Sequence, residues 1–443
     1  MQVLLIFILI VVFGYLFSSL IIRGLPLAER GGLSYLLGMG IVTLLLFFSS
    51  WVGIKITAVS VLTIVSGLIA LLLFVFVFLR RKVEINLPNV QLIFRKLSWP
   101  EKIICLVIGV AISFSLLIAL YYPVYVWDAL ALYDFTAKIV AQTGYFVQIA
   151  NQYFYFAQYP LLVPLGHTIV YLFGGSNPQF IYSLYFFSFA VIFYSVIRKK
   201  SSRLIALFAT LLLVTNPILF AHSTIAYTNL PYTTFYVIGI IYLYTAVIRN
   251  RLDYLFISSL LIGFSTWARS AEPLWLTEIL IVLIYAVHKK SIYPALIFLF
   301  PFLVIQQPWN VFQARLYGLT LSTVGQLSLI PTILSAGIDF KRILDVSLYI
   351  YRNIIQSWGP IFMIFLIVVF FDIKNRFNNK SLIMLLIILA NFMAVYIGTY
   401  LFSIRFEEWK AIPDSAVRMS MFFPPLMIYY ISLVLGLVSS KSK

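Results

Sequence analysis

Charged residues are scarce in this chain of 443 residues, making up 10% of it, whereas 63% of the residues are hydrophobic. Soluble domains are about 25% charged, and the mean hydropathy here is +1.03. Acidic residues are the scarcest, 14 against 31 basic ones, giving a formal net charge of +17. The basic residues are scattered between apolar runs, so they form no basic face for nucleic acid. The composition predicts a polytopic membrane protein whose basic loops face anionic lipid.

Cysteine and histidine are scarce as well. The single cysteine, Cys105, lies inside an apolar run, which excludes an intrachain disulfide. The histidines lie far apart and have no cysteine neighbours, so an ordinary zinc site has too few ligands; they are His167, His222 and His288. The carboxylates leave room for a divalent cation such as Mg²⁺ or Mn²⁺, which the sequence does not require.

Apolar runs of spanning length predict an all-α fold with about 13 transmembrane helices. The expected spans are 2–22, 33–54, 56–79, 103–122, 179–197, 204–220, 231–248, 252–268, 273–287, 292–305, 354–371, 381–402 and 419–438. The first run has no basic segment before it and no cleavage pattern, so we expect a retained span. The apolar stretch 161–173 is short and contains Pro164, which favours a juxtamembrane helix.

Lysine and arginine cluster at 80–102 and again at 198–203, which predicts that both connections face the cytoplasm. The segment 123–178 between them is then extracytoplasmic, and the protein is expected in the plasma (cytoplasmic) membrane. We expect three parts: additional N-terminal helices at 1–102, a core at 103–290 with the outer loop 123–178, and C-terminal helices at 291–443 with an outer loop at 306–353.

The candidate catalytic residues are Asp128 and Asp134, in the stretch YVWDALALYDFTAKIVAQTG directly after the fourth span. At the membrane rim, Asp128 could act as general base on an acceptor hydroxyl. A helix from Ala129 to about Val140 would put the two carboxylates on different faces. Simpler explanations are a helix N-cap for Asp128 and a surface ion pair between Asp134 and Lys138.

The candidate substrate-binding residues are polar or charged groups on the expected outer side or near it. Cations could stabilise the charge of a leaving phosphate, although topology or lipid anchoring also explains them. Glu278 is the only charge well inside an expected span, where an internal pair between helices is the alternative. A satisfied buried histidine is the alternative for both histidines of the set. The set is Lys138, His167, His222, Arg269, Glu272, Glu278 and Arg418.

Four segments in order resemble the GT-C class of membrane glycosyltransferases, in particular the relatives of protein mannosyltransferases and of the lipid A aminoarabinose transferase. They are WDALALYDFTAKIVAQTG, QYPLLVPLGHTIVYLFGG, TNPILFAHSTIAYTNLPYTTF and FSTWARSAEPLWL. The resemblance covers roughly residues 122–290, with a weaker echo at RMSMFFPP from Arg418. It implies that Asp128 is the catalytic acidic residue of an extracytoplasmic first loop.

By the same resemblance, the donor is a polyprenyl-phosphate-linked sugar and the transfer is inverting, onto a glycan, lipid or protein acceptor. Two departures stand out. Asn229 occupies a position where the family commonly has an aspartate, and four spans precede the first loop instead of one. A transporter or flippase for a lipid-linked or amphipathic solute is the main alternative, and an inactive structural subunit is another. A transporter predicts several ionisable groups at mid-membrane and repeat symmetry, and the sequence has neither.

Overall fold

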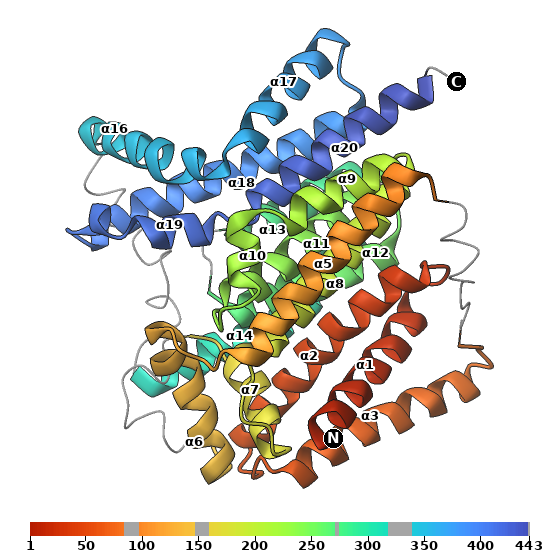
Figure 1. Cartoon of the computed structure of the whole chain (residues 1–443), viewed down its shortest axis with the longest axis vertical. Coiled ribbons are helices and arrows are strands. Elements are labelled where there is room, and N and C mark those ends of the chain that lie inside the picture. Colours follow the sequence, from red (N-terminus) through yellow and green to blue (C-terminus); the bar gives the residue numbers. More distant parts are fainter. Residues whose placement is uncertain (84–96, 147–158, 271–273, 318–338, 442–443) are drawn as a thin grey trace. The chain divides into compact units, whose positions relative to one another are not determined.

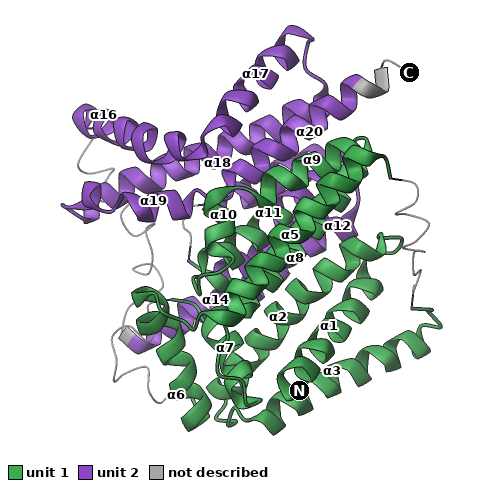
Figure 2. Ribbon diagram, viewed as in Figure 1, with its two compact units in different colours: residues 1–238, 267–269 green, residues 239–266, 270–443 purple. Residues whose placement is uncertain are grey.

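The structure is a computed structural model that describes residues 1–83, 97–146, 159–270, 274–317 and 339–441. The described residues form helices and no strands, which confirms the all-α prediction. They divide into two compact units: unit 1 comprises residues 1–238 and 267–269, and unit 2 comprises 239–266 and 270–443 (Figure 2).

Unit 1 is built mainly from apolar helices (Figure 1). They are α1 (Gln2–Ile21), α2 (Leu27–Trp51), α3 (Ala58–Phe78), α5 (Trp99–Tyr121), the π-helix η1 (Ala129–Asp134), α6 (Phe135–Thr143), α7 (Leu162–Leu172), α8 (Phe180–Arg198), α9 (Arg203–Val214) and α10 (Pro217–His222). The unit also holds the start of α11 (Asn229–Arg249) and the end of α12 (Leu252–Ala268).

Unit 2 contains the remainder of α11 and α12 together with the C-terminal helices. These are α13 (Leu274–His288), α14 (Tyr293–Tyr317), α16 (Phe340–Tyr349), η5 (Ile350–Ile355), η6 (Gln356–Trp358), α17 (Pro360–Lys374), α18 (Asn379–Arg405), η7 (Trp409–Ala411), α19 (Pro413–Met419) and α20 (Phe423–Lys441).

The expected spans fall on helical residues. Within the described residues, however, fewer helices than the predicted 13 are long and apolar enough to cross a membrane. Nine helices of the described part are long and apolar enough to cross a membrane, or ten if the bent pair at 340–358 and 360–374 forms one span. The expected span 204–220 is broken into α9 and α10, where Asn216 caps α10 and Pro217 begins it. Four apolar helices are shorter: α7, α9, α12 and α13.

The expected outer loop 306–353 is wrong at its start, because α14 continues to Tyr317. Pro301 and Pro308 lie inside this helix: Pro301 belongs to the expected span 292–305, whereas Pro308 lies where the loop was expected. Prolines are tolerated in membrane helices where neighbouring groups satisfy the freed backbone. The expected loop also contains α16, and its residues 318–338 lie outside the described part.

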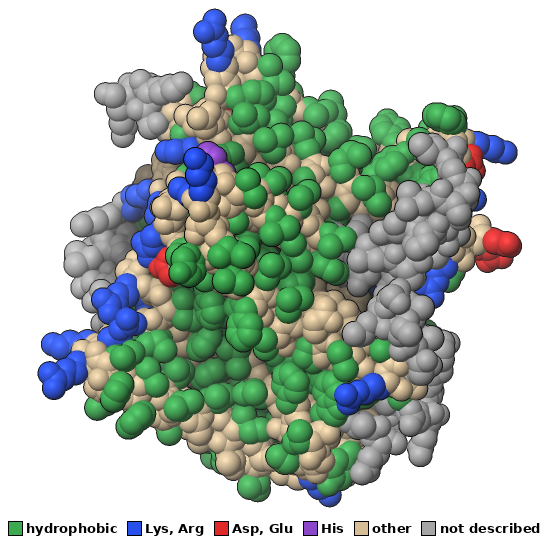
Figure 3. Space-filling view, turned by 180° about the vertical axis from the view of Figure 1, so that it is seen from behind, with side chains coloured by type: hydrophobic (Ala, Val, Ile, Leu, Met, Phe, Trp, Pro, Cys, Tyr) green, Lys and Arg blue, Asp and Glu red, His purple; other side chains and the backbone are tan. Residues whose placement is uncertain are grey.

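Hydrophobic side chains dominate the surface drawn in Figure 3, whereas Lys and Arg side chains gather mostly at its margins. The helices α3 and α5 expose large apolar side chains, among them Phe74, Val77, Leu106 and Leu117. Exposure of this kind is expected of helices whose solvent is lipid. Together with the number of apolar helices, it identifies an integral membrane protein.

Ion pairs join connections that the charge bias assigns to one side. Arg203 at the start of α9 donates from Nε to Oε1 of Glu101 at 2.8 Å, and Glu101 also accepts from the backbone N–H of Ser98 at 2.8 Å at the start of α5. Lys199 pairs with Glu29 at 2.6 Å, at the start of α2. These contacts bring the starts of α2, α5 and α9 and the end of α8 together within unit 1.

The opposite ends of the same helices carry η1, α6 and α7. Gly144 ends α6 in the left-handed conformation, with φ of 80°, and its carbonyl accepts from Ile56 N–H at 2.7 Å in the α2–α3 connection. Ser50 near the end of α2 accepts from Phe146 N–H at 2.9 Å. The amide of Asn177 donates to the carbonyls of Ala119 and Tyr122 at 3.0 Å, at the end of α5. The described parts of the expected outer loop 123–178 are therefore anchored on several helix ends.

Candidate functional site

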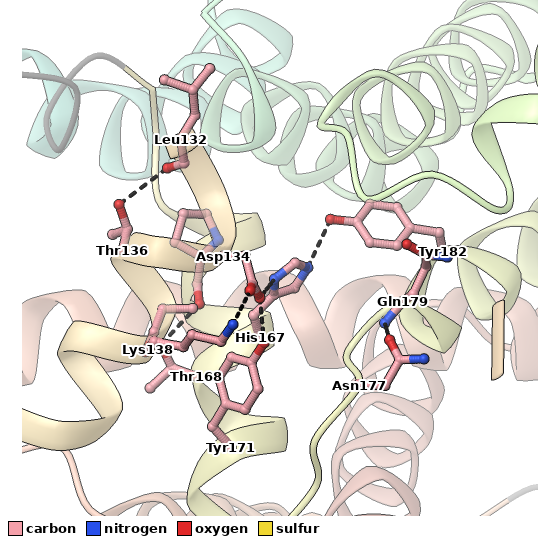
Figure 4. A network of polar contacts seen from close by, with 12 residues as sticks. Leu132, Asp134, Thr136, Lys138, His167, Thr168, Tyr171, Asn177, Gln179 and Tyr182 are labelled. Atoms are coloured by element: carbon pink, nitrogen blue, oxygen red, sulfur yellow. Dashed lines mark hydrogen bonds and ion pairs between the residues drawn. The ribbon is translucent and has the colours of Figure 1, made fainter. Parts of the chain in front are cut away.

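Asp134 is the centre of a buried polar network in unit 1 (Figure 4). Its carboxylate pairs with Lys138 at 2.8 Å and with Nδ1 of His167 at 3.3 Å, and it accepts a hydrogen bond from the Tyr171 hydroxyl. The other ring nitrogen of His167 lies 2.9 Å from the Tyr182 hydroxyl. The network therefore ties η1 and α6 to α7 and α8.

These contacts keep Asp134 ionised, whereas burial keeps His167 neutral. Burial alone would raise the pKa of Asp134, but the hydrogen bonds that it accepts from His167, Lys138 and Tyr171 lower it to about 2. Burial lowers the pKa of His167, and this outweighs the opposite effect of Asp134. An ionised carboxylate only accepts hydrogen bonds, so Nδ1 of His167 carries the proton and Nε2 accepts from Tyr182. A carboxylate held in this way is a weak base.

The ion pair expected between Asp134 and Lys138 is confirmed, but Asp134 is buried, so it is not a surface pair. The side chain of Asp134 is 2% exposed and that of Lys138 is 52% exposed. His167 is buried and both ring nitrogens have partners, which confirms the alternative of a satisfied buried histidine.

A second cluster forms around Arg269, the residue that follows α12. Its Nη1 donates to Oδ1 of Asn229 at 3.2 Å, and its guanidinium lies 5.9 Å from the centre of the Tyr159 ring. Tyr159 packs edge to face on Tyr133, with ring centres 5.6 Å apart. The hydroxyl of Tyr133 lies 3.3 Å from Oγ1 of Thr228, which precedes α11. We call Tyr133, Tyr159, Thr228, Asn229 and Arg269 the arginine cluster.

Asp128 directly precedes η1, and η1 carries Tyr133 into the arginine cluster. Burial raises the pKa of Tyr133, the charge of Arg269 lowers it, and the charge of Asp128 raises it. Asp128 is half-buried, its backbone is already helical, and its side chain makes no capping hydrogen bond, so the N-cap alternative is wrong.

The segment between Asp128 and α6 is a π-helix, η1, rather than the expected α-helix from Ala129. In it, Phe135 N–H donates to the carbonyl of Leu130, five residues earlier. Single π-turns are rare and often occur at functional sites. In this wider helical turn the side chain of Tyr133 lies near Thr228, and that of Asp134 lies near His167.

No group of three or more His, Cys, Asp or Glu side chains suited to a metal ion occurs among the described residues. The arginine cluster is also unsuited to a divalent cation. Asn229 offers its amide oxygen to a guanidinium there, and a positive charge beside that oxygen repels a metal ion. Asn229, which stands where the family commonly has an aspartate, therefore binds an arginine rather than a metal ion.

The remaining predicted site residues lie elsewhere. His222, in α10, is buried beside the ring of Tyr227. Glu278 in unit 2 is buried and accepts a hydrogen bond from the Asn391 amide of α18 at 3.0 Å. Arg418, also in unit 2, pairs with Asp414 at 3.0 Å. Glu272 lies outside the described residues.

Several residues of these clusters were not predicted. Tyr159 belongs to an aromatic run at the expected membrane rim, for which an interfacial belt is the commoner explanation and sugar stacking the alternative. Tyr171, Tyr182 and Thr228 carry no sequence signal that separates them from other residues in or beside apolar helices. For Tyr133 the only signal is its position between Asp128 and Asp134.

In a comparison with protein families, residues 166–312 match the model of the dolichyl-phosphate-mannose-protein mannosyltransferase family. The matched segment runs from α7 into α14, so it contains Asn229 and Arg269 but begins after Asp128. Neither curated proteins nor solved structures gave a match. The family match confirms the resemblance to the GT-C class of membrane glycosyltransferases that the four ordered segments indicate.

Proposed function

We propose that this chain transfers a sugar from a polyprenyl-phosphate-linked donor to an acceptor hydroxyl at the extracytoplasmic side of the membrane. The family that residues 166–312 match is described by its use of dolichyl-phosphate mannose, which supports a lipid-linked donor. The observation that carries the proposal is that Arg269 lies on the ring of Tyr159, which packs on Tyr133 in the π-helix that directly follows Asp128. A base and a cation are the two groups that such a transfer needs.

In the proposed reaction, the acceptor oxygen attacks the anomeric carbon while the bond from that carbon to the phosphate oxygen breaks. Asp128 takes the proton of the acceptor hydroxyl, a role worth roughly 10² to 10⁴ in rate. The polyprenyl phosphate leaves with the bonding electron pair, and Arg269 stabilises its charge. The half-buried position of Asp128 gives it access to an acceptor, which the enclosed carboxylate of Asp134 lacks.

Asp134 then acts as a positioning residue. Its bonds to α6, α7 and, through His167, to α8 hold η1, and η1 carries Tyr133 and follows Asp128 directly. Lys138 is occupied with Asp134, so we assign the phosphate contact to Arg269 rather than to Lys138.

The proposal is tested with Asp128→Asn, compared with Asp253→Asn as a matched control. Asp253 lies in the first turn of α12 and forms an ion pair with Arg251 within unit 2. Both variants and the native chain are purified in mild detergent, and bound lipids are identified by mass spectrometry. We expect polyprenyl-phosphate sugar on the native chain, more of it on Asp128→Asn because turnover is blocked, and native behaviour of Asp253→Asn. Bulk phospholipid alone in all three samples would contradict the donor class.

The second measurement is transfer itself, using the co-purified lipid class as donor. Asp128→Asn should lose transfer by roughly 10²-fold or more, with normal abundance in the membrane. Full activity of this variant would exclude Asp128 as the base.

A further inference from the structure

Asn229 presents a buried amide group that no described residue accepts from. The residue is 1% exposed, and its Nδ2 has no hydrogen-bond partner in the described part of the chain. A guanidinium only donates, so the Asn229 oxygen must face Arg269 and the amide NH₂ must face away from it. A buried donor without an acceptor costs free energy that a ligand oxygen would remove.

The surroundings of this donor are positive. Arg269 lies beside it, and Asn229 is the first residue of α11, a helix of 21 residues whose N-terminus carries a partial positive charge. The amide is neutral, so it orients the guanidinium without cancelling its charge. A carboxylate at position 229 would cancel that charge.

We infer that Arg269 and the Nδ2 group of Asn229 form a recess for the phosphate of the lipid-linked donor, in which the guanidinium takes the place of a metal ion. This inference rests on the proposed function and names the residues and the charge that the leaving group meets. The ligand class is a phosphate ester: its oxygens accept from both the guanidinium and the amide, and its negative charge matches the arginine.

The aromatic rings of the arginine cluster hold the recess in shape. Arg269 lies against Tyr159, and Tyr159 packs on Tyr133, whose hydroxyl lies near Thr228 directly before Asn229. These contacts leave the guanidinium half-buried, with one edge on Asn229. An arginine held on one edge and one face presents its other donors in a fixed direction.

The test compares Asn229→Asp and Asn229→Ala with the native chain, using a polyprenyl monophosphate in detergent micelles as probe and the uncharged polyprenol as its control. Asn229→Asp keeps the shape but neutralises Arg269, and Asn229→Ala removes the donor but leaves the charge. We expect phosphate binding to fall by about tenfold or more in Asn229→Asp and by less in Asn229→Ala. Polyprenol binding should be unchanged.

This order separates ligand contact from packing. If Asn229 only filled space, the isosteric Asp would bind better than Ala, and that result would overturn the inference. Asn216→Asp is the matched control, because Asn216 caps α10 by accepting from two backbone N–H groups, a role that Asp also fills. Loss of phosphate binding in Asn216→Asp equal to that in Asn229→Asp would also overturn it.

A chelator distinguishes the guanidinium from a metal ion. Native transfer should be unchanged in EDTA, and a strict requirement for a divalent cation would contradict the recess as described. Binding of the polyprenyl phosphate with the expected order of variants but no transfer would leave the recess standing and refute the proposed function. If Asn229→Asp kept full transfer activity, the recess would be refuted and the proposed function would stand.

Discussion

Asp134 and His167 form a buried pair in which the carboxylate lies 3.3 Å from Nδ1 of the ring. The pair joins η1 to α7, and the Tyr182 hydroxyl extends it to α8. Because Asp134 also binds Lys138 and Tyr171, the segment that follows Asp128 is fixed at one end by four side chains. The position of Asp128, the proposed base, thus depends on Asp134, which itself takes no part in the proposed reaction.

Replacing Asp134 by Asn should destabilise the protein more than replacing Asp128. The amide keeps the size of the carboxylate but points donors at the Tyr171 hydroxyl or at His167, and it leaves Lys138 without its partner. We expect a loss of about 2 to 3 kcal/mol in unfolding free energy, and close to none for Asp128→Asn. Thermal unfolding in detergent measures both. Equal unfolding temperatures for the two variants would show that the network carries no stability.

The neutral state of His167 predicts loss of stability in mild acid. Burial places the pKa of His167 below its ordinary value of 6.5, so the unfolded chain takes up a proton first as the pH falls. Stability is therefore fully present above about pH 6.5 and decreases below it, until the folded pKa is reached.

Unfolding temperatures measured from pH 8 to pH 5 should show this slope, and His167→Gln should flatten it. His288→Gln replaces an exposed histidine and serves as the control that keeps the native slope. If the unfolding temperature of His167→Gln fell with pH as steeply as that of the native chain, groups other than His167 would cause the loss of stability.

The sequence predicted the helical class and the position of nearly every apolar helix, because spanning length and the bias of Lys and Arg are strong local signals. It did not predict where α14 ends or that η1 is a π-helix. Pro308 is an ordinary helix breaker in water, but α14 continues past it to Tyr317. The turn type of η1 depends on tertiary contacts of Tyr133 and Asp134, which no local pattern encodes.

The candidate site was predictable only as a set of residue types. Asp128, Asp134, Lys138 and Arg269 were named from charge at a membrane rim, but the sequence could not divide them into two clusters. That division is made by His167, Tyr182 and Tyr159, which come from other segments of unit 1. Contacts of this kind are long-range in the chain, so a pattern confined to one segment cannot contain them.

In unit 2, Glu278 and Asn391 should show energetic coupling. The Asn391 amide donates to Glu278 at 3.0 Å and to the Ile387 carbonyl at 3.0 Å, and both side chains are buried. Hydrogen bonds between membrane helices are worth about 0.6 kcal/mol on average and up to about 1.7. We expect coupling near the upper value because one partner is a carboxylic group.

Unfolding free energies of Glu278→Leu, Asn391→Leu and the double variant measure this coupling. The double variant should be more stable than the sum of the single losses predicts, because neither side chain then leaves a buried polar partner. Additive losses would show that Glu278 acts independently of α18, which would favour a functional role for its carboxyl group.

Arg269→Lys should impair transfer although the charge is kept. A lysine cannot contact Asn229, lie along the Tyr159 ring and bind a phosphate at once, because its ammonium is a single point charge on a flexible stem. We expect transfer to fall by about 10²-fold, with the larger part of the loss in kcat if the guanidinium acts on the leaving phosphate. Arg251→Lys, at an ion pair with Asp253, is the matched control and should transfer normally. Native kcat with a raised KM in Arg269→Lys would instead mean that Arg269 binds the donor equally in the ground state and the transition state.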